Sequence, residues 1–292
     1  MTRLQQALQR RDFVVTGEIG PPKGVNMETC MHEADLIKDR VVAINVTDNQ
    51  SSVLPLGSIA VCDKLVQAGC EPVFQLTCRD RNRLALESDI LSAYTMGVRN
   101  MLALTGDHNA VGDHPESMPV FDLDSVSLLA TLSTLKSGKD LSGEEMYGAP
   151  TDIFAGAVVA PGIDPMEAQL FKMEAKVEAG AQFFQTQAIY EPAVMEKFME
   201  RASQFGVPVL AGIVLIKSAG MARFMNANVP GVTVPDHMIQ AMSDAKRSAR
   251  PQTSVELAAE LIQELKPMCQ GVHIMAMGWE EHVPGLLDAC GL

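Results

Sequence analysis

The chain lacks the sequence patterns that mark several kinds of site. Its six cysteines are dispersed without any C-x-x-C pair, and its six histidines contain no H-E-x-x-H pattern. Zinc sites need Cys and His ligands at such short spacings. We therefore expect no metal site built by this chain alone, and reduced thiols in a reducing compartment. A Rossmann fingerprint and a Walker loop are also absent, so any nucleotide must be bound in another way.

Basic residues are scarce as well. The 292 residues include 23 Lys and Arg against 36 Asp and Glu, a formal net charge of −13, and aromatic residues make up only 5%. Without a basic block, this composition disfavours nucleic acid and anionic membranes as partners. No apolar run approaches the roughly 20 residues that cross a bilayer. The first ten residues lack the apolar core of a secretory signal and favour a short amphipathic helix, so we expect a cytoplasmic protein.

What the chain does contain is a regular alternation of apolar strand-like runs with helical patterns. Strands alternating with helices of this length are typical of parallel βαβ units, and about 250 residues suffice for eight of them. The sequence therefore predicts one (β/α)8 TIM barrel, an α/β fold of a single domain over residues 1–292 with a short N-terminal helix. The eight expected strands are 13–19, 41–48, 72–78, 100–106, 153–159, 182–188, 208–215 and 271–277.

Several helix boundaries are also marked in the sequence. Asp164 is expected as an N-cap, with Pro165 at the first helical position and Gly180 closing that helix. The segment Thr253-Ser254-Val255-Glu256 has the pattern of a capping box, which predicts a helix that begins there.

Five of the expected strands end in polar residues. These are Glu18, Thr47, Gln75, Asp107 and Gln187. Because the carboxyl ends of the strands of a parallel barrel share one face, and active sites lie there, we expect these residues to build one site. The long connection 107–122 follows the fourth strand and is expected to act as a lid or a cofactor loop.

The carboxyl groups among them are the acid–base candidates. Glu18 is followed by Gly20-Pro21-Pro22, and a glutamate held against apolar barrel walls is favoured in its protonated form, as a general acid requires. Spacing alone leaves an ion-paired or solvated glutamate equally open. Asp107 follows a glycine that allows backbone amides to approach a ligand, although a turn or N-cap aspartate fits the same pattern.

The uncharged strand-end residues suit a different task. Gln187, Gln75 and Thr47 offer donors and acceptors for the edge of a heterocycle, unless buried polar groups at the barrel mouth only satisfy one another. Lys176, on the helix before the sixth strand, is placed to reach a phosphate, although a lone helix lysine is more often solvated. His273 in the last strand fits a core histidine better than a ligand.

In order along the chain, these positions resemble the methylenetetrahydrofolate reductase family, flavin-dependent barrels of one-carbon metabolism. The resemblance runs from about Phe13 to Trp279. The motifs that carry it are Gly17-Glu18-Ile19-Gly20-Pro21-Pro22, Asn45-Val46-Thr47, Gln75-Leu76-Thr77-Cys78, Ala103-Leu104-Thr105-Gly106-Asp107, Lys176-Val177-Glu178-Ala179-Gly180-Ala181, Gln185-Thr186-Gln187 and Gly212-Ile213. Each is weak alone, but all seven occur in the family's order.

The resemblance implies a reaction and roles in it. Glu18 corresponds to the general acid that helps to open the five-membered ring of 5,10-methylenetetrahydrofolate. Hydride then passes from reduced flavin to the methylene carbon and gives 5-methyltetrahydrofolate. Asp107 is expected to contact the pterin and influence the flavin, and Gln187 to hydrogen-bond folate or the incoming nicotinamide. The flavin-binding residues implied are Thr47, Asp48, Gln75, Leu104, Thr105, Gly106, Asp107, Gln169 and Lys176.

Departures from the family pattern concern mainly the flavin. Gln75 stands where the family often has His, Thr105 where it has Arg, and Val158-Val159-Ala160-Pro161 where it has a Tyr-Pro-Glu…His-Pro run. In the family these positions contact the phosphates and the adenosine end of the flavin, so the resemblance leaves both FAD and FMN possible as the cofactor. The last strand usually carries an Arg for the folate tail. Here Trp279 stands close by, placed to stack on the aminobenzoate ring of folate.

The segments 217–224 and 275–279 are similar to reductases of acetogenic bacteria, in which the barrel commonly works with a partner subunit. The resemblance therefore implies a homo-oligomer, or a hetero-oligomer with an electron-delivering subunit, and leaves NADH as a possible direct donor. Two alternatives stay open. One is a folate-binding or scaffold subunit without redox activity. The other is a methyl-transfer barrel that acts on a corrinoid protein without flavin.

Overall fold

The computed structural model describes residues 1–292, and its centre is a closed barrel of eight parallel strands in the order β1 to β8. All eight expected strands are present, with ends that differ from the expected runs by no more than two residues. They are β1 Val14–Ile19, β2 Ala43–Val46, β3 Pro72–Thr77, β4 Asn100–Leu104, β5 Phe154–Val159, β6 Phe183–Ala188, β7 Val209–Val214 and β8 Gly271–Met275. The predicted (β/α)8 barrel is confirmed.

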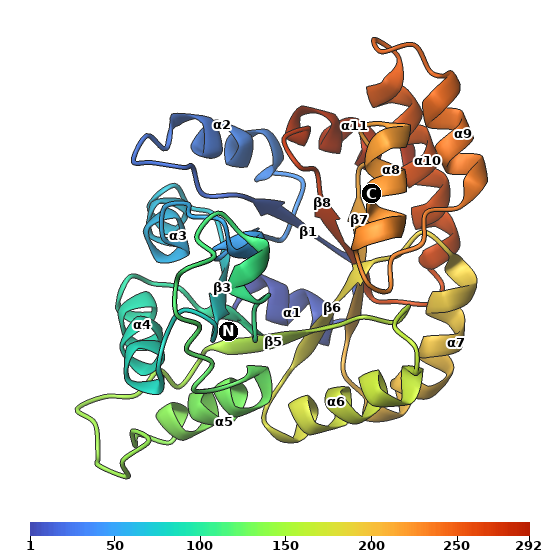
Figure 1. Cartoon of the computed structure of the whole chain (residues 1–292). Helices are drawn as coiled ribbons and strands as arrows, with labels where there is room; N and C mark the ends of the chain where they lie inside the picture. The colour runs from blue at the N-terminus through green and yellow to red at the C-terminus, as the bar shows by residue number, and fades with distance from the viewer.

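Helices surround the strands on the outside (Figure 1). The α-helices are α1 Arg3–Gln9, α2 Glu28–Ile37, α3 Ser58–Gln67, α4 Arg83–Thr95, α5 Ser125–Lys136, α6 Met166–Glu178, α7 Pro192–Ala202, α8 Ala219–Asn228, α9 Asp236–Asp244, α10 Arg250–Leu265 and α11 Val283–Ala289. Short 3-10 turns are η1 Gln50–Ser52, η2 Asn109–Val111, η3 Ser203–Phe205 and η4 Glu280–His282. None of the helices combines the length and the apolar character that crossing a membrane requires.

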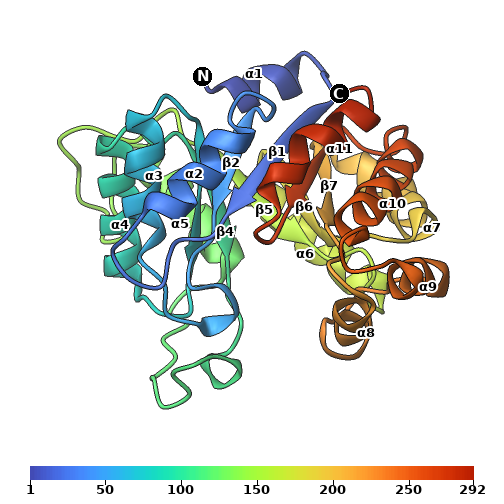
Figure 2. The ribbon, with the colours of Figure 1, turned by 90° about the horizontal axis from the view of Figure 1, so that it is seen from above.

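The two ends of the barrel differ. Helix α1 lies across one end, while the loop that contains η2 and helix α8 extend beyond the other (Figure 2). The buried face of α1, Leu4, Ala7 and Leu8, packs on side chains that fill the barrel interior, including Phe154 and Phe183. This apolar plug closes the amino end of the barrel. A site open to ligands is therefore expected at the carboxyl end, where such barrels hold their active sites.

Two predicted helix starts are wrong. Asp164 does not cap α6, because Pro165 still has extended backbone angles (ψ 136°) and the helix begins one residue later without a side-chain cap. The predicted capping box at Thr253 lies inside α10, which already begins at Arg250. Pro251 sits in its first turn, where a fixed φ and a missing N–H suit a helix start. Thr253 instead donates its hydroxyl to the carbonyl oxygen of Ala249 at 3.2 Å.

Candidate active site

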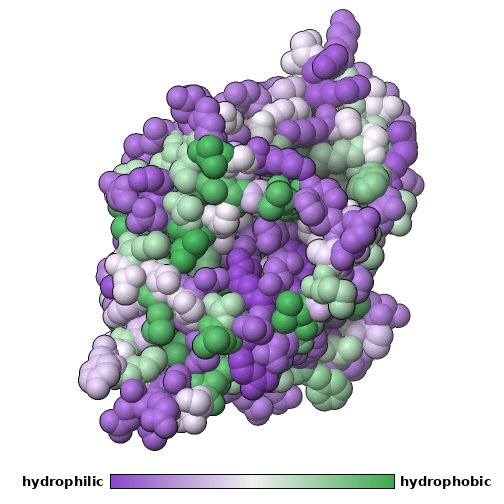
Figure 3. Space-filling view, turned by 60° about the vertical axis from the view of Figure 1, so that its left-hand side comes forward, coloured by the Kyte–Doolittle hydropathy of each residue, from purple (hydrophilic) through white to green (hydrophobic).

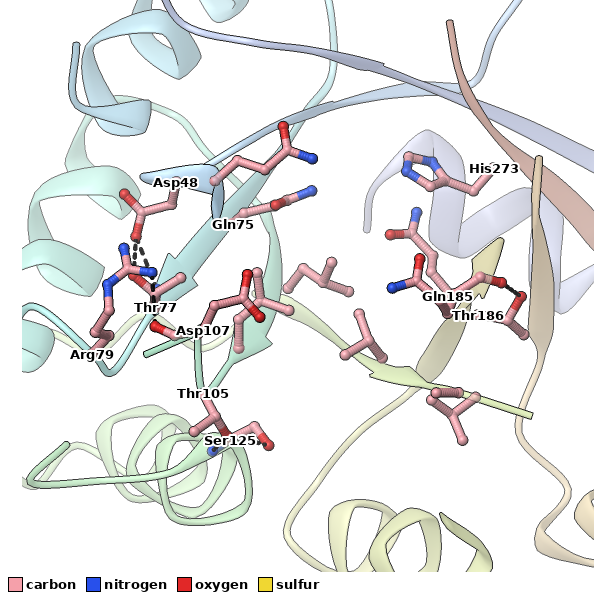
Figure 4. Close-up of a pocket in the computed structure, with 18 of the residues that line it drawn as sticks. Asp48, Gln75, Thr77, Arg79, Thr105, Asp107, Ser125, Gln185, Thr186 and His273 are labelled. Carbon is pink, nitrogen blue, oxygen red and sulfur yellow. Dashed lines mark hydrogen bonds between the residues drawn. The ribbon is translucent and has the colours of Figure 1, made fainter. Parts of the chain in front are cut away.

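A cavity of about 430 Å³ opens at the carboxyl ends of the strands. On the space-filling surface, a hollow near the middle of one face is coloured hydrophilic (Figure 3). The close-up of the cavity places Gln185 and His273 on one side, with Asp48, Thr77 and Asp107 on the other (Figure 4). Polar side chains from many strands therefore converge on one space, as the sequence pattern predicts.

Four of the five polar strand ends line this cavity: Glu18, Gln75, Asp107 and Gln187. Thr47 does not line it and is 4% exposed. A Cβ atom added to Gly20 would lie 3.8 Å from its hydroxyl oxygen, so Thr47 packs beside the loop after β1.

Glu18 is a largely enclosed carboxyl group of the cavity wall. Its side chain is 10% exposed, and its Oε2 accepts a hydrogen bond from Nε2 of Gln75 at 2.9 Å. Nε2 of His273 lies 3.3 Å from the same oxygen. The three side chains come from β1, β3 and β8 and hold the carboxyl group in one place. Its other oxygen, Oε1, has no hydrogen-bond partner within the protein.

Asp107 sits on the rim, directly after Gly106. Gly106 has φ +91°, and a Cβ there would lie 3.1 Å from Cβ of Arg79 and 3.3 Å from Cβ of Thr77, so a side chain fits neither the space nor the backbone. The main-chain oxygen of Asp107 accepts a hydrogen bond from Arg79 at 3.2 Å. Its exposed carboxylate forms no ion pair and stays free to meet a ligand.

Asp48 also lines the cavity, but its carboxylate is occupied. It accepts hydrogen bonds from the backbone N–H and the hydroxyl of Thr77, at 2.9 and 2.8 Å, and from the hydroxyl of Ser58 at 3.2 Å. Arg81 forms two further bonds to it, at 2.7 and 3.1 Å. Because the side chain is fully buried, these contacts compensate its charge and brace the loops after β2 and β3.

One wall of the cavity is cationic. Lys172 and Lys176 of α6 both line it, and neither forms an ion pair. Nζ of Lys176 donates to the carbonyl oxygen of Val158 at 2.7 Å. Burial, with the nearby charge of Lys172, lowers the pKa of Lys176 to about 8. Hydroxyls of Thr105 and Ser125 lie on the same cavity lining, 3.3 Å apart. An anionic group fits this wall because it would compensate the unpaired charge.

The remaining predicted residues fall into two groups. Leu104, Thr105, Gly106 and Gln169 line the cavity, with Oε1 of Gln169 accepting from the backbone N–H of Ala160 at 3.4 Å. Trp279 lies outside the lining, half-buried, with Nζ of Lys217 5.4 Å from its ring centroid. The structure therefore keeps Trp279 apart from the cavity.

A register shift at the end of β6 exposes Gln187. The pairing of β6 with β7 is irregular between Gln185 and Ala188, and the N–H of Gly212 donates to the hydroxyl of Thr186 at 2.9 Å. Gln187 is consequently exposed in the cavity, while Gln185 and Ala188, on either side of the shift, are buried.

Some cavity residues were not predicted as site residues. Arg79, 1% exposed, donates to the carbonyl oxygens of Asn49 and Asp107 and thereby ties the loops after β2 and β4 together. His273 was expected as a core histidine and is indeed buried, yet it also contacts Glu18. Closure of β8 on β1 pairs His273 with Thr16, two residues before Glu18. A predicted barrel therefore already indicates that His273 lies close to Glu18. No group of three His, Cys, Asp or Glu is arranged to hold a metal ion.

A closed parallel barrel with a charged, amide-lined cavity over its carboxyl ends is the architecture of barrel proteins that bind small ligands at that face. Residues 3–291 match the family model described as methylenetetrahydrofolate reductase, and the chain belongs to that family. The resemblance found in the sequence is thereby confirmed.

Curated relatives carry the same name. The chain is 26% identical over 229 residues to methylenetetrahydrofolate reductase 2 of Schizosaccharomyces pombe, covering 74% of this chain and 35% of that protein. It is 23% identical to the probable methylenetetrahydrofolate reductase (NADPH) of Caenorhabditis elegans, covering 84% and 36%. The 5,10-methylenetetrahydrofolate reductase of Pectobacterium carotovorum is 24% identical, covering 86% and 80%. The chain thus spans only about a third of the two eukaryotic relatives.

Among solved structures, an uncharacterized protein from Clostridium thermocellum that binds two copies of 5-methyl-5,6,7,8-tetrahydrofolic acid has a similar fold. The TM-score is 0.66 at 14% identity, with 99% of this chain and 98% of that chain covered. At this identity the likeness shows the fold alone.

Proposed function

We propose that the chain is a cytoplasmic, flavin-dependent reductase that converts 5,10-methylenetetrahydrofolate to 5-methyltetrahydrofolate. The observation that carries the proposal is Glu18, a carboxyl group only 10% exposed and held by Gln75 and His273 in the wall of a polar cavity, in a chain of this family. The Pectobacterium relative, of which the chain covers 80%, bears the name of this activity. The Clostridium neighbour, which binds the methylated folate, supports a folate as the ligand.

The residues present fit a bound flavin. The unpaired Lys172 and Lys176 line the same cavity as the hydroxyls of Thr105 and Ser125, and this donor set suits a phosphate group. Gly106 lines the same cavity without a side chain, which leaves room there for a ligand. When bound, reduced flavin supplies the hydride that the methylene carbon receives. This donor set does not distinguish FMN from FAD, because both carry a phosphate on the ribityl chain.

The chain's own groups then have separable tasks. Glu18 donates a proton to the folate nitrogen that leaves the methylene carbon, which opens the five-membered ring. Asp107, with its free carboxylate on the rim, hydrogen-bonds the amino-substituted edge of the pterin. Gln187, whose Oε1 accepts from the N–H of Ala188 at 3.0 Å, keeps its amide N–H groups for folate or for a nicotinamide. The apolar Leu104 and Val158 help to exclude water around them.

The first experiment is the visible spectrum of the purified protein, with mass identification of any released cofactor. Flavin bleached by NADH and restored by methylenetetrahydrofolate supports a self-sufficient reductase. Flavin that only an artificial reductant bleaches, and that folate reoxidises, supports a catalytic subunit that takes electrons from a partner. Protein that neither holds nor binds added flavin refutes the proposal and favours a folate-binding or methyl-transfer subunit instead.

The assigned acid is tested by Glu18→Gln, which keeps the shape and removes the proton. We expect flavin to bind and to be reduced as before, while its reoxidation by folate slows by about 100-fold or more, the contribution of a general acid. Glu28→Gln, at the exposed start of α2, is the matched control. Reoxidation at the wild-type rate in Glu18→Gln would remove Glu18 from the role of acid.

A further inference from the structure

Behind Glu18, a row of polar side chains crosses the interior of the barrel from β2 through β6 and β1 to β8. Nδ2 of Asn45 donates to Oε1 of Gln185 at 2.7 Å, and Nε2 of Gln185 lies 3.2 Å from both Oδ1 of Asn45 and the hydroxyl oxygen of Thr16. That hydroxyl oxygen lies 2.9 Å from Nδ1 of His273, whose Nε2 lies 3.3 Å from Oε2 of Glu18. The row therefore ends on the proposed acid.

These groups are cut off from water. Thr16 and Asn45 are 0% exposed, Gln185 is 2% and His273 is 3% exposed. A buried donor or acceptor without a partner costs about 1–3 kcal/mol, so each side chain must find its partners within the row. Gln185 and His273 both face the cavity in Figure 4, and the row is the structural support behind that wall.

The direction of each hydrogen bond follows from the orientation of the two amides in the structure. Gln185 uses Oε1 to accept from Asn45, which leaves its Nε2–H groups for Asn45 Oδ1 and for the Thr16 oxygen. Nδ1 of His273 is the only acceptor within reach of the buried Thr16 hydroxyl, so that hydroxyl donates its proton to Nδ1. A neutral imidazole accepts at one nitrogen and donates at the other. His273 consequently carries its proton on Nε2, directed at Glu18.

We infer that His273 is a positioning residue for Glu18, locked as its Nε2–H tautomer by Thr16 and, behind Thr16, by the Asn45–Gln185 pair. Together with Gln75, His273 donates to Oε2 of Glu18. Because both donors occupy Oε2, the transferable proton belongs on Oε1, the oxygen that no protein group contacts. The tautomer is a property of the folded chain. Its consequence for catalysis rests on the proposed function.

The tautomer is read directly from the ¹⁵N spectrum of the purified protein, in which couplings to the ring protons identify the protonated nitrogen. The His273→Gln spectrum assigns the signal among the six histidines. We expect protonation at Nε2 in the wild-type protein. Thr16→Val, which keeps the shape and removes the hydroxyl, should shift the ring to a mixture of tautomers, and Thr16→Ser should restore Nε2–H. A wild-type ring protonated at Nδ1 alone would overturn the inference, whether or not the protein reduces folate.

Kinetics supply the second readout. In Thr16→Val we expect kcat for folate reduction to fall about tenfold with little change in KM or flavin content, because only the orientation of the acid is disturbed. Thr16→Ser should recover most of that loss. Thr131→Val, in which a buried hydroxyl on α5 is removed away from the cavity lining, is the matched control for a lost buried hydrogen bond.

The two readouts distinguish failure of the inference from failure of the proposed function. If the wild-type protein does not reduce folate at all, the proposed function is refuted, and the ¹⁵N spectrum alone then decides the tautomer of His273. Folate reduction unaffected by Thr16→Val would contradict the positioning role.

Discussion

Nε2 of Gln75 lies 2.9 Å from Oε2 of Glu18 and is the shorter of the two contacts that hold this carboxyl group. An amide donates without carrying charge, so Gln75 fixes Glu18 without the ionic stabilisation of the carboxylate that a protonated imidazole or a guanidinium would add. At this position in β3 the chain thus uses a neutral donor. Gln75 therefore positions the carboxyl group without adding a charge next to it.

The first prediction concerns this donor. Gln75→Met keeps the length of the side chain and removes the hydrogen bond, so Glu18 is left with His273 alone. We expect kcat for folate reduction to fall about tenfold, part of the 100-fold or more that a general acid contributes. Stopped-flow reoxidation of the flavin measures the step. Gln67→Met, on the exposed face of α3, is the control, and an unchanged rate in Gln75→Met would show that the contact has no role.

The barrel itself was predictable because each strand and helix is marked locally. Apolar runs ended by polar residues recur with helical patterns between them, and the structure closes the eight parallel strands into a barrel. Helix starts were less predictable. Pro165 and Pro251 each have a local backbone preference, but whether a proline stands before a helix or in its first turn depends on angles that the sequence pattern does not reveal.

The site was predictable only in part, because partners are decided by packing between distant segments. Asp48 has the pattern of a cavity ligand, yet its charge is compensated by Arg81, 33 residues away. His273 has the pattern of a core histidine, and its contact with Glu18 bridges 255 positions of sequence. Thr47 ends its strand as Glu18 and Gln75 do, but it lies outside the cavity lining.

The second prediction concerns Arg81 and Asp48. Arg81→Met leaves the fully buried Asp48 carboxylate without its cation, and we expect the free energy of unfolding to fall by about 3 kcal/mol. Urea unfolding measures the change. Adding Asp48→Asn to the same chain should recover part of the loss, since no uncompensated charge then remains. Arg201→Met removes an exposed ion pair with Glu167 and should leave the midpoint of urea unfolding near that of the wild type. Equal effects of the two arginine variants would contradict the prediction.

The third prediction concerns the loop after β4, which the sequence predicts to be a lid or a cofactor loop. Gly112 packs against the loop after β2 so closely that an added Cβ would lie 1.8 Å from the carbonyl oxygen of Ser52. Asp113 beside it bonds Nζ of Lys23 at 2.6 Å and the N–H of Leu54 at 3.0 Å. Contact with Lys23, His114 and Leu54 lowers the pKa of Asp113. Loops after β1, β2 and β4 are thereby joined at one place.

Gly112→Ala should push these loops apart while the barrel below stays folded. We expect a protease to cut within 107–122 several-fold faster than in the wild type, with the cooperative unfolding transition largely retained, because the loop adds little to the core. Limited proteolysis with mass spectrometry locates the cut. Gly285→Ala is the control, because nothing lies within 4 Å of a Cβ added at this position of α11. The protease should cut this variant at the wild-type rate. If the protease cut Gly112→Ala no faster than the control, the loop would be held by other contacts.

The last prediction concerns Lys176, whose pKa burial lowers from the ordinary 10.5 to about 8. Between these two values the unfolded chain binds more protons than the native protein, so the free energy of unfolding rises with pH across this window. Below pH 8 the folded protein bears the full cost of a buried cation. Lys176→Met should therefore stabilise the protein at pH 7 by about 2 kcal/mol, and this gain should vanish as the pH approaches 10.5.

If the buried charge of Lys176 serves to bind an anionic ligand, Lys176→Met must weaken the binding of that ligand. Inorganic phosphate should raise the thermal midpoint of the wild-type protein but not that of Lys176→Met, and flavin affinity should fall. Lys136 is the matched control. Burial also lowers the pKa of Lys136, and its Nζ donates to the carbonyl oxygen of Ile153 at 3.1 Å, but it lies outside the cavity. Lys136→Met should keep the response to phosphate. If both variants lost the response to phosphate, or if both kept it, the claim that Lys176 binds the anionic ligand would be wrong.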